Sequence, residues 1–174
     1  MTTSPSTAPE AITHELTFSG GLLKRGFWLY IWEITTPDES HLYYVGRTGD
    51  SSSSNAQSPF NRMGQHLGFR KESNSLRRRL EERGIDPETC SFRLVAFGPI
   101  LKEEASRDTH RECRDRIAPM EKALADAMTA AGYHLLNTVN CRVKLDTQMF
   151  VPILSAFARE FPKLSNRMES HESR

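Results

Sequence analysis

An aromatic and branched run followed by a short turn places the tightest constraint on how this chain can fold. Residues 27–34 read Phe-Trp-Leu-Tyr-Ile-Trp-Glu-Ile, and residues 41–46 read His-Leu-Tyr-Tyr-Val-Gly. Both compositions favour β-strands, and the Pro, Asp and Ser of residues 36–40 favour a turn. The pattern predicts an antiparallel hairpin. The nearly unbroken apolarity of 27–34 further predicts a central strand covered on both faces.

Signals farther along predict one more strand and several helices around this hairpin. Ser58 and Pro59 suit a helix start, and Gly84 and Gly132 suit helix ends. Pro119 is expected to open, or to kink, the helix that runs to residue 131. The expected helices are 59–69, 75–83, the charged stretch 102–116, 119–131 and 147–161, and the expected strand is 91–98. The predicted fold class is α+β, with a small three-stranded antiparallel sheet flanked by helices and an extra C-terminal helix.

Composition divides the chain into one ordered region and two polar ends. Residues 15–141 are expected to form one domain with a Ser-rich inserted loop at 51–58, and residues 142–164 a C-terminal helix packed on that domain. The predicted buried face of that helix consists of Met149, Ile153, Leu154, Phe157 and Phe161. Residues 1–14 and 165–174 carry little to bury, which predicts disorder at both ends.

The compartment is predicted from apolar runs and cysteines. No apolar stretch approaches the roughly 18–20 residues of a membrane span, and the first ten residues lack the pattern of a secretory signal. The three cysteines are widely spaced and form no CxxC pair. We therefore expect reduced thiols, no membrane partner and a cytoplasmic location.

Positive charge is concentrated in one stretch although the net charge is only +1. Residues 62–83 contain seven Arg or Lys against three Glu, an excess that can neutralise several phosphates. A solvated helix face with internal ion pairs is the alternative. The arginines that would contact nucleic-acid phosphates are Arg70, Arg77, Arg78 and Arg79 of this stretch, together with Arg47 before it.

Several polar side chains are expected to converge. Arg62 and His66 lie at i and i+4 and would share one helix face, which Arg70 would continue at i+8. A guanidinium binds phosphate oxygens in a bidentate manner, and an imidazole can move a proton. Tyr30 and Tyr44 belong to the two strands of the hairpin. A phenol is a poor base near pH 7 unless nearby cations stabilise its phenolate, and packing is the alternative role for each tyrosine.

A carboxylate and an amide complete the set. Glu121 follows Pro119 and would lie in the first turn of a helix, where it would either compensate the helix dipole or hold one Mg²⁺. Asn137 follows two leucines, a setting that fits the cap of a turn.

The ordered set of these residues resembles the GIY-YIG nuclease superfamily over roughly residues 27–138. The motifs that carry the resemblance are Leu29-Tyr30, Tyr44-Val45-Gly46-Arg47-Thr48, Arg62, His66, Glu121 and Asn137. The resemblance implies hydrolysis of DNA strands with one divalent cation, Mg²⁺ or Mn²⁺. This chain departs from the family pattern at Trp28, where a glycine is usual, and in the fifteen residues that separate Gly46 from Arg62.

Roles carried over from the resemblance are specific to residues. Tyr30, in preference to Tyr44, would deprotonate the attacking water. Arg62 would stabilise the charge at phosphorus and His66 would assist proton transfer. The resemblance also implies that Glu121 holds the metal and that Asn137 supports the site. It implies that Gly46 allows a close approach of the backbone.

We therefore expect a metal-dependent DNA endonuclease. Two alternatives remain open from the sequence: a catalytically silent nucleic-acid-binding module, and a protein-interaction domain that uses the basic helix. Since no separate recognition domain is visible, target specificity would come from loops, from the termini, from a homodimer or from a partner protein.

Overall fold

Three antiparallel strands form the centre of the protein. The computed structural model describes residues 11–50, 55–70 and 74–165, and its sheet has the order β2-β1-β3. The strands are β1 (Phe27–Thr35), β2 (His41–Arg47) and β3 (Ser91–Leu101). The predicted hairpin and the predicted central strand are confirmed, because β1 pairs with β2 on one side and β3 on the other.

Within the described residues, four α-helices lie around this sheet. They are α1 (Pro59–Leu67), α2 (Ser75–Glu81), α3 (Arg107–Ala130) and α4 (Thr147–Glu160), and short 3₁₀ turns span Gly20–Leu23, Pro87–Thr89 and Pro162–Leu164. Ser58 caps α1 as expected, because its hydroxyl accepts a hydrogen bond from the backbone N–H of Asn61 and Pro59 follows it. The α+β class and the small antiparallel sheet follow the prediction.

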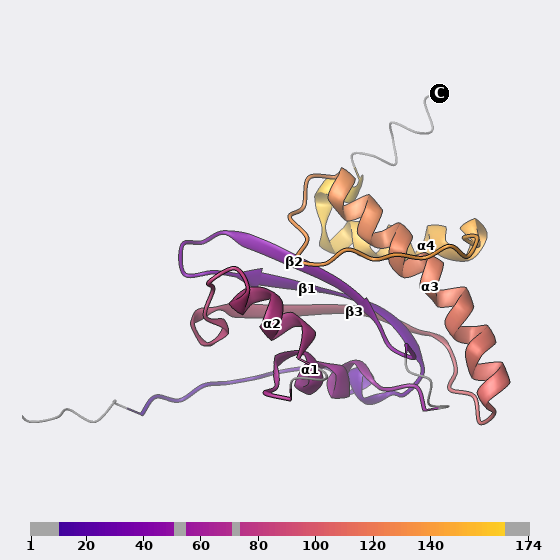
Figure 1. Ribbon diagram of the computed structural model, residues 1–174, viewed down its shortest axis with the longest axis horizontal. Coiled ribbons are helices and arrows are strands. Elements are labelled where there is room, and N and C mark those ends of the chain that lie inside the picture. The colour runs from indigo at the N-terminus through magenta and orange to yellow at the C-terminus, as the bar shows by residue number, and fades with distance from the viewer. Residues whose placement is uncertain (1–10, 51–54, 71–73, 166–174) are drawn as a thin grey trace, which may run out of the picture.

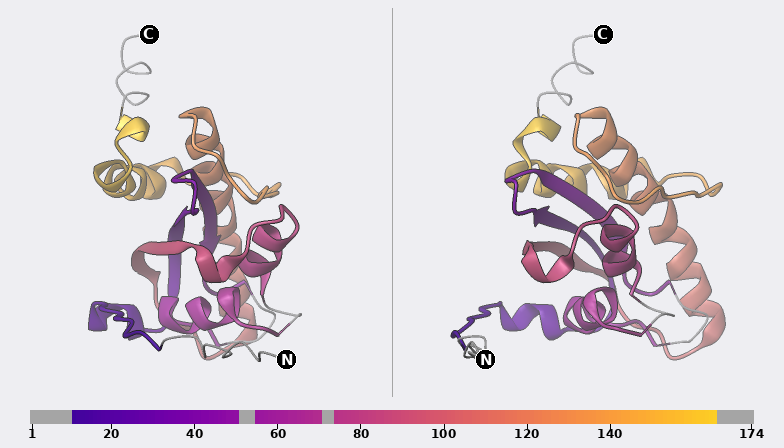
Figure 2. Two further views of the ribbon diagram at one scale, coloured as in Figure 1. Left: turned by 90° about the vertical axis from the view of Figure 1, so that its left-hand side faces the viewer. Right: turned by 60° about the vertical axis from the view of Figure 1, so that its left-hand side comes forward.

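Alternation along β1 divides the core into two layers. Phe27, Leu29 and Ile31 belong to the apolar cluster that includes α3 and α4. Tyr30 and Trp32 belong to a second cluster, which includes α2 and the apolar side of α1. Figure 1 shows the helices on either side of the sheet, and in both views of Figure 2 α4 and α1 lie at opposite ends of the molecule.

One long helix replaces the two segments predicted around Pro119. α3 runs without interruption from Arg107 to Ala130 with Pro119 inside it. The proline ring fixes φ at a helical value, so the helix continues with the loss of one backbone hydrogen bond, and Pro119 itself is buried in the core. The prediction that Glu121 lies in a first helical turn is therefore wrong: Glu121 is an interior residue of α3.

The helix that carries Arg62 and His66 is shorter than predicted. α1 ends at Leu67, and Gly68 after it has extended backbone. Arg70 consequently lies beyond the helix, and the prediction that it continues the Arg62–His66 face is wrong. β3, by contrast, continues three residues past Gly98, to Leu101.

The C-terminal helix is part of the main core. The buried residues of α4 are Phe150, Ile153, Phe157 and Ala158. Phe150 was missing from the predicted face, whereas Met149 and Leu154 are only half-buried. Of the segments predicted to be disordered or inserted, residues 1–10, 51–54 and 166–174 lie outside the described residues. Residues 11–14 are exposed and belong to no helix or strand.

No helix within the described ranges combines the length and the apolarity needed to cross a membrane.

Candidate active site

A buried phenol and a buried imidazole meet between β1 and α1. Tyr30 Oη lies 2.6 Å from His66 Nε2, and the two rings approach edge to face. Tyr30 points to the α1 side because it alternates with Leu29 and Ile31. His66 points back to the sheet from the last turn of α1. The structure thus brings two residues 36 positions apart in sequence into hydrogen-bond contact.

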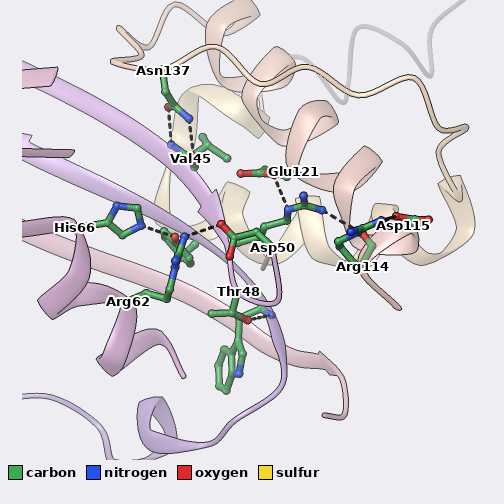
Figure 3. A network of polar contacts seen from close by, with 12 residues as sticks. Val45, Thr48, Asp50, Arg62, His66, Arg114, Asp115, Glu121 and Asn137 are labelled. Carbon is green, nitrogen blue, oxygen red and sulfur yellow. Dashed lines mark hydrogen bonds and ion pairs between the residues drawn. The ribbon is translucent and has the colours of Figure 1, made fainter. Parts of the chain in front are cut away.

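Arg62 lies one helical turn before His66 and reaches the same phenol. Its guanidinium lies near enough to Tyr30 to oppose the rise in the pKa of the phenol. It also pairs with Asp50, at 2.9 Å between Nη2 and Oδ2, and donates to Gln65 Oε1. Its Nε is buried and has no hydrogen-bond partner among the described residues. A charged fork with one unused donor is suited to receive a phosphate oxygen. Figure 3 shows Arg62 between His66 and Asp50.

Burial controls the protonation of this pair. It raises the pKa of Tyr30 far above its ordinary value, and the opposing effect of Arg62 is smaller. Burial, followed by the charge of Arg62, lowers the pKa of His66 to about 3. At neutral pH the site therefore holds a neutral phenol and a neutral imidazole. Arg62 does not by itself produce the phenolate.

Glu121 lies across the site from this group, on α3. Arg47 Nε is 3.0 Å from Glu121 Oε2, and both side chains are less than one-fifth exposed. The contact is an ion pair with poor hydrogen-bond geometry, since the same Nε atom makes no well-directed hydrogen bond. Burial raises the pKa of Glu121 to about 7; Arg47 and Arg62 oppose this, and the neighbouring charge of Asp50 adds to it. The carboxyl is thus poised between its neutral and charged forms.

Tyr44 occupies a different position from Tyr30. It pairs in register with Trp32, and its hydroxyl lies 3.2 Å from Ser75 Oγ at the start of α2. Ser75 Oγ is also 2.8 Å from His66 Nδ1. The Tyr44 ring packs edge to face against the His66 ring, but its hydroxyl connects to the imidazole only through Ser75, whereas the Tyr30 hydroxyl contacts the imidazole directly.

Two glycines make room for aromatic rings at this site. A Cβ atom on Gly46 would lie 2.5 Å from the Tyr30 ring, so the close approach predicted at Gly46 is made by a tyrosine ring rather than by backbone. Trp28, the residue in the place of the family's glycine, packs over Gly98, where a Cβ would lie 2.7 Å from its indole. The register of β1 against β3 shifts between Phe27 and Leu29, and this irregularity accommodates Trp28.

Asn137 holds the outer edge of β2. Its side-chain oxygen accepts from the N–H of Val45, and its nitrogen donates to the Val45 carbonyl (Figure 3). Val45 immediately precedes Gly46, so these two bonds fix the strand beside the Tyr30 ring. Asn137 therefore supports strand β2 and does not cap a turn.

The arginines predicted to bind DNA have unequal surroundings. Arg47 pairs with Glu121 and donates to the carbonyl of Arg114. Arg77 donates to the Leu67 carbonyl and stacks over a phenylalanine ring, and Arg79 donates to the carbonyl of Leu136. Arg78 is more than half exposed.

Arg70 lies on the surface in the connection that follows α1.

Two residues of the site were missed by the sequence analysis. Asp50, which pairs with Arg62, lies between the predicted strand 41–46 and the predicted loop 51–58 and was assigned no role. Ser75 was read only as the start of a basic helix. Neither residue stands at a helical or strand spacing from its partner. The tertiary fold brings Asp50 to Arg62 and Ser75 to His66.

Glu121 and Asp50 carry carboxylate oxygens, which are the donors that a hard cation such as Mg²⁺ prefers. Within the described ranges no three His, Cys, Asp or Glu residues are grouped as a metal site. Mg²⁺, however, needs only one or two protein carboxylates and keeps several waters. Glu121 is a buried carboxyl whose pKa is raised to about 7 with Asp50 close enough to contribute, and a cation beside it would favour its ionised form.

No family model, curated protein or solved structure matches this chain.

Proposed function

We propose that this chain is a metal-dependent DNA endonuclease of the GIY-YIG type. The observation that supports the proposal most is the contact of Tyr30 with His66 at 2.6 Å, beside an Arg62 charge close enough to act on the pKa of the phenol. The resemblance selected these three residues from their order and spacing in the sequence, and packing alone does not require a phenol, an imidazole and a guanidinium at one point. Glu121 and Asn137 lie at the same end of the sheet, one across the site and one on the strand that carries Gly46.

The residues can transfer the proton of an attacking water. Tyr30 Oη takes a proton from the water while its own proton passes to His66 Nε2 at 2.6 Å. The resulting hydroxide forms a bond to phosphorus, the bond from phosphorus to the leaving oxygen breaks, and the leaving alkoxide takes a proton from solvent. Because burial keeps Tyr30 neutral at rest, its two proton transfers must be coupled, and the phenolate does not accumulate.

Arg62 and Asp50 would control phosphate entry. In the free protein Asp50 neutralises the Arg62 guanidinium. An arriving phosphate would take the place of Asp50, using the fork and the unpartnered Nε of Arg62. The positive charge of Arg62 would then stabilise the negative charge that develops at phosphorus.

A divalent cation would be held by Glu121, with Asp50 near enough to assist once it leaves Arg62. When bound, such a cation supplies Lewis-acid stabilisation of the phosphate and leaving oxygens. The part of Arg47 is to hold the Glu121 side chain in place between the sheet and α3.

Cleavage assays with purified protein test this function. Plasmid, branched and single-stranded DNA are incubated with Mg²⁺, with Mn²⁺ or with EDTA. We expect strand cleavage only in the presence of the cation. Tyr30→Phe and Arg62→Ala should lower the rate by about 10²- to 10⁴-fold, and Glu121→Ala should abolish it.

Tyr43→Phe is the matched control, because Tyr43 is a phenol on the opposite face of β2 that donates to Glu33. It should cut at the wild-type rate. Equal rates for wild type and Glu121→Ala would refute the metal assignment. Binding of DNA without cleavage of any substrate would instead support the silent nucleic-acid-binding module.

A further inference from the structure

The hydroxyl of Ser75 contacts two members of the candidate site. Ser75 is the first residue of α2, and its Oγ lies 2.8 Å from His66 Nδ1 and 3.2 Å from Tyr44 Oη. The cap position of this helix is Asn74, whose side chain makes no capping hydrogen bond. The Ser75 hydroxyl therefore connects α2 to α1 and β2.

The donors around Tyr30 determine which atom of His66 carries a lone pair. Arg62 carries only donors and a positive charge, which lowers the pKa of the nearby phenol, so Tyr30 cannot donate its hydrogen to Arg62. The hydrogen of this fully buried phenol then needs an acceptor of its own. Among the described residues that acceptor is His66 Nε2, at 2.6 Å. Nε2 consequently has a lone pair directed at Tyr30.

The single proton of the neutral imidazole must then be on Nδ1. Burial and the charge of Arg62 lower the pKa of His66 to about 3, so the ring is neutral at working pH. The Nδ1–H group donates to Ser75 Oγ, which leaves the Ser75 hydrogen available to Tyr44 Oη. Each polar atom in this chain of four side chains has a partner in that arrangement.

We propose that Ser75 is a positioning residue that holds His66 in its Nδ1–H tautomer, with Nε2 as the acceptor of the Tyr30 proton. In the opposite tautomer Nε2–H would donate to Tyr30, and the imidazole would have no site for the phenol's proton. In the proton transfer, the Oη–H bond of Tyr30 breaks and an Nε2–H bond forms, while Nδ1–H is retained. The catalytic consequence rests on the proposed nuclease function, whereas the tautomer does not.

Nitrogen-15 NMR of the histidine rings tests the tautomer in the metal-free protein without any cleavage assay. The wild type should show a protonated Nδ1 and an unprotonated Nε2 for His66. Ser75→Ala removes the acceptor of Nδ1–H, so the two nitrogen shifts should move toward each other as the tautomers mix. Ser75→Thr keeps a hydroxyl and should restore the wild-type pattern.

Tyr44→Phe is the control for a general disturbance of this contact, because it removes the second partner of Ser75 and leaves the Ser75–His66 bond. It should retain the Nδ1–H tautomer. The signals of His110, which is buried against Phe27 in the other layer, should be unchanged in every variant. An Nε2–H tautomer in the wild type would overturn the proposal even if Ser75→Ala fails to fold. So would an unchanged tautomer in a folded Ser75→Ala protein.

Kinetics separate this proposal from the proposed function. Ser75→Ala should lower kcat by about 10- to 100-fold with KM unchanged, since Ser75 acts through His66, and Ser75→Thr should recover most of that loss. If the wild type never cuts DNA but shows the expected tautomers, the nuclease function fails and the positioning by Ser75 stands. If the wild type cuts and Ser75→Ala cuts equally fast, the positioning role is wrong and the nuclease function stands.

Discussion

The residues packed around Tyr30 fix the position of its ring and of its hydroxyl. Gly46 lies opposite it in the register of β1 and β2, and the Tyr30 ring occupies the space that a side chain at Gly46 would fill. The hydroxyl at the far end of the ring is hydrogen-bonded to His66. A Cβ atom at Gly46 would lie 2.6 Å from this hydroxyl oxygen, so even a small side chain there would displace it.

Gly46→Ala should destabilise the protein and reduce catalysis together. Its Cβ would lie 2.5 Å from the Tyr30 ring, and overpacking of this kind costs about 1–3 kcal/mol. Chemical denaturation and cleavage rates measure the two effects. Gly64→Ala is the control, because nothing lies within 4 Å of a Cβ there, and alanine in a helix should add about 0.5–1 kcal/mol. Equal stability of the two variants would contradict the close packing at Gly46.

Glu121 should make the stability of the metal-free protein fall with rising pH. Its pKa is raised from an ordinary 4.5 to about 7, chiefly by burial, so folding favours the protonated form. The stabilisation from this group is complete below pH 4.5 and is lost as the pH approaches 7. The loss is at most about 3 kcal/mol. Urea unfolding at pH 5.5 and pH 8 in EDTA measures it.

Glu121→Gln is the control for this titration and should lack that part of the pH dependence. A cation that binds the carboxylate must displace the proton, so Mg²⁺ should stabilise the wild type more at pH 8 than at pH 5.5. The same pH dependence in wild type and Glu121→Gln would show that another group titrates.

The sequence could predict residues whose partners are periodic and could not predict those brought together by the fold. Arg62 and His66 were found because i and i+4 share a helix face. Asp50 and Ser75 have no such relation to the residues they contact, since each contact depends on how a connecting segment returns to the site. Glu121 lies beside Arg47 in the structure, but the prediction that it belongs to a first helical turn was wrong.

At the scale of elements, that error has its source in Pro119. Proline is a strong signal for the start of a helix, but φ near −65° is also compatible with a helix interior when packing outweighs one lost hydrogen bond. The continuity of α3 places Glu121 in the middle of a rigid helix, where Arg47 from β2 can reach it. A residue in a first turn would have had the helix dipole as its main partner.

The basic helix α2 shows why charge alone does not identify a DNA-binding surface. Arg77 and Arg79 lie in the same run as Arg78, but they make backbone contacts to Leu67 and Leu136 that hold the helix in place. Only about one-eighth of the Arg77 side chain is exposed, against more than half for Arg78. The role predicted for the run is therefore best tested at Arg78.

Arg78→Gln should weaken DNA binding without loss of stability and reduce the slope of log Kd against log salt by about 1. Fluorescence anisotropy over a salt series measures the slope. Arg159→Gln removes the same charge from the exposed side of α4, at the end of the molecule opposite α1, and should leave the slope unchanged. Equal slopes for both variants would mean that α2 is not on the DNA path. Arg77→Gln is expected to lower the unfolding temperature.

At the scale of the whole molecule, the two core layers meet at β1, and the candidate site lies at the end of the sheet where both contribute. Tyr30 belongs to the layer of α1 and α2, whereas Glu121 comes from α3 in the other layer. The hairpin and the central strand were predictable because strand pairing follows local pattern. The distribution of helices between the two faces was not predictable, because it depends on which apolar faces meet across the sheet.

The burial of α4 in the core predicts that the C-terminal helix is necessary for folding. Phe150, Ile153 and Phe157 of α4 are buried with Phe27 and Leu29 of β1 in one cluster. Each large apolar side chain contributes about 1.5–3 kcal/mol by its burial. Three of them together are comparable with the whole free energy of unfolding of a typical domain, about 5–15 kcal/mol.

A chain that ends at Leu145 should therefore lose cooperative unfolding, and its cleavage activity with it, although every candidate site residue is present. Circular dichroism during thermal unfolding and the binding of a hydrophobic dye measure this loss. A chain that ends at Ser165 retains α4 and the 3₁₀ turn after it, and it should unfold like the full-length protein. A sharp transition in the shorter chain would instead show that residues up to 145 fold independently and that α4 is an accessory element.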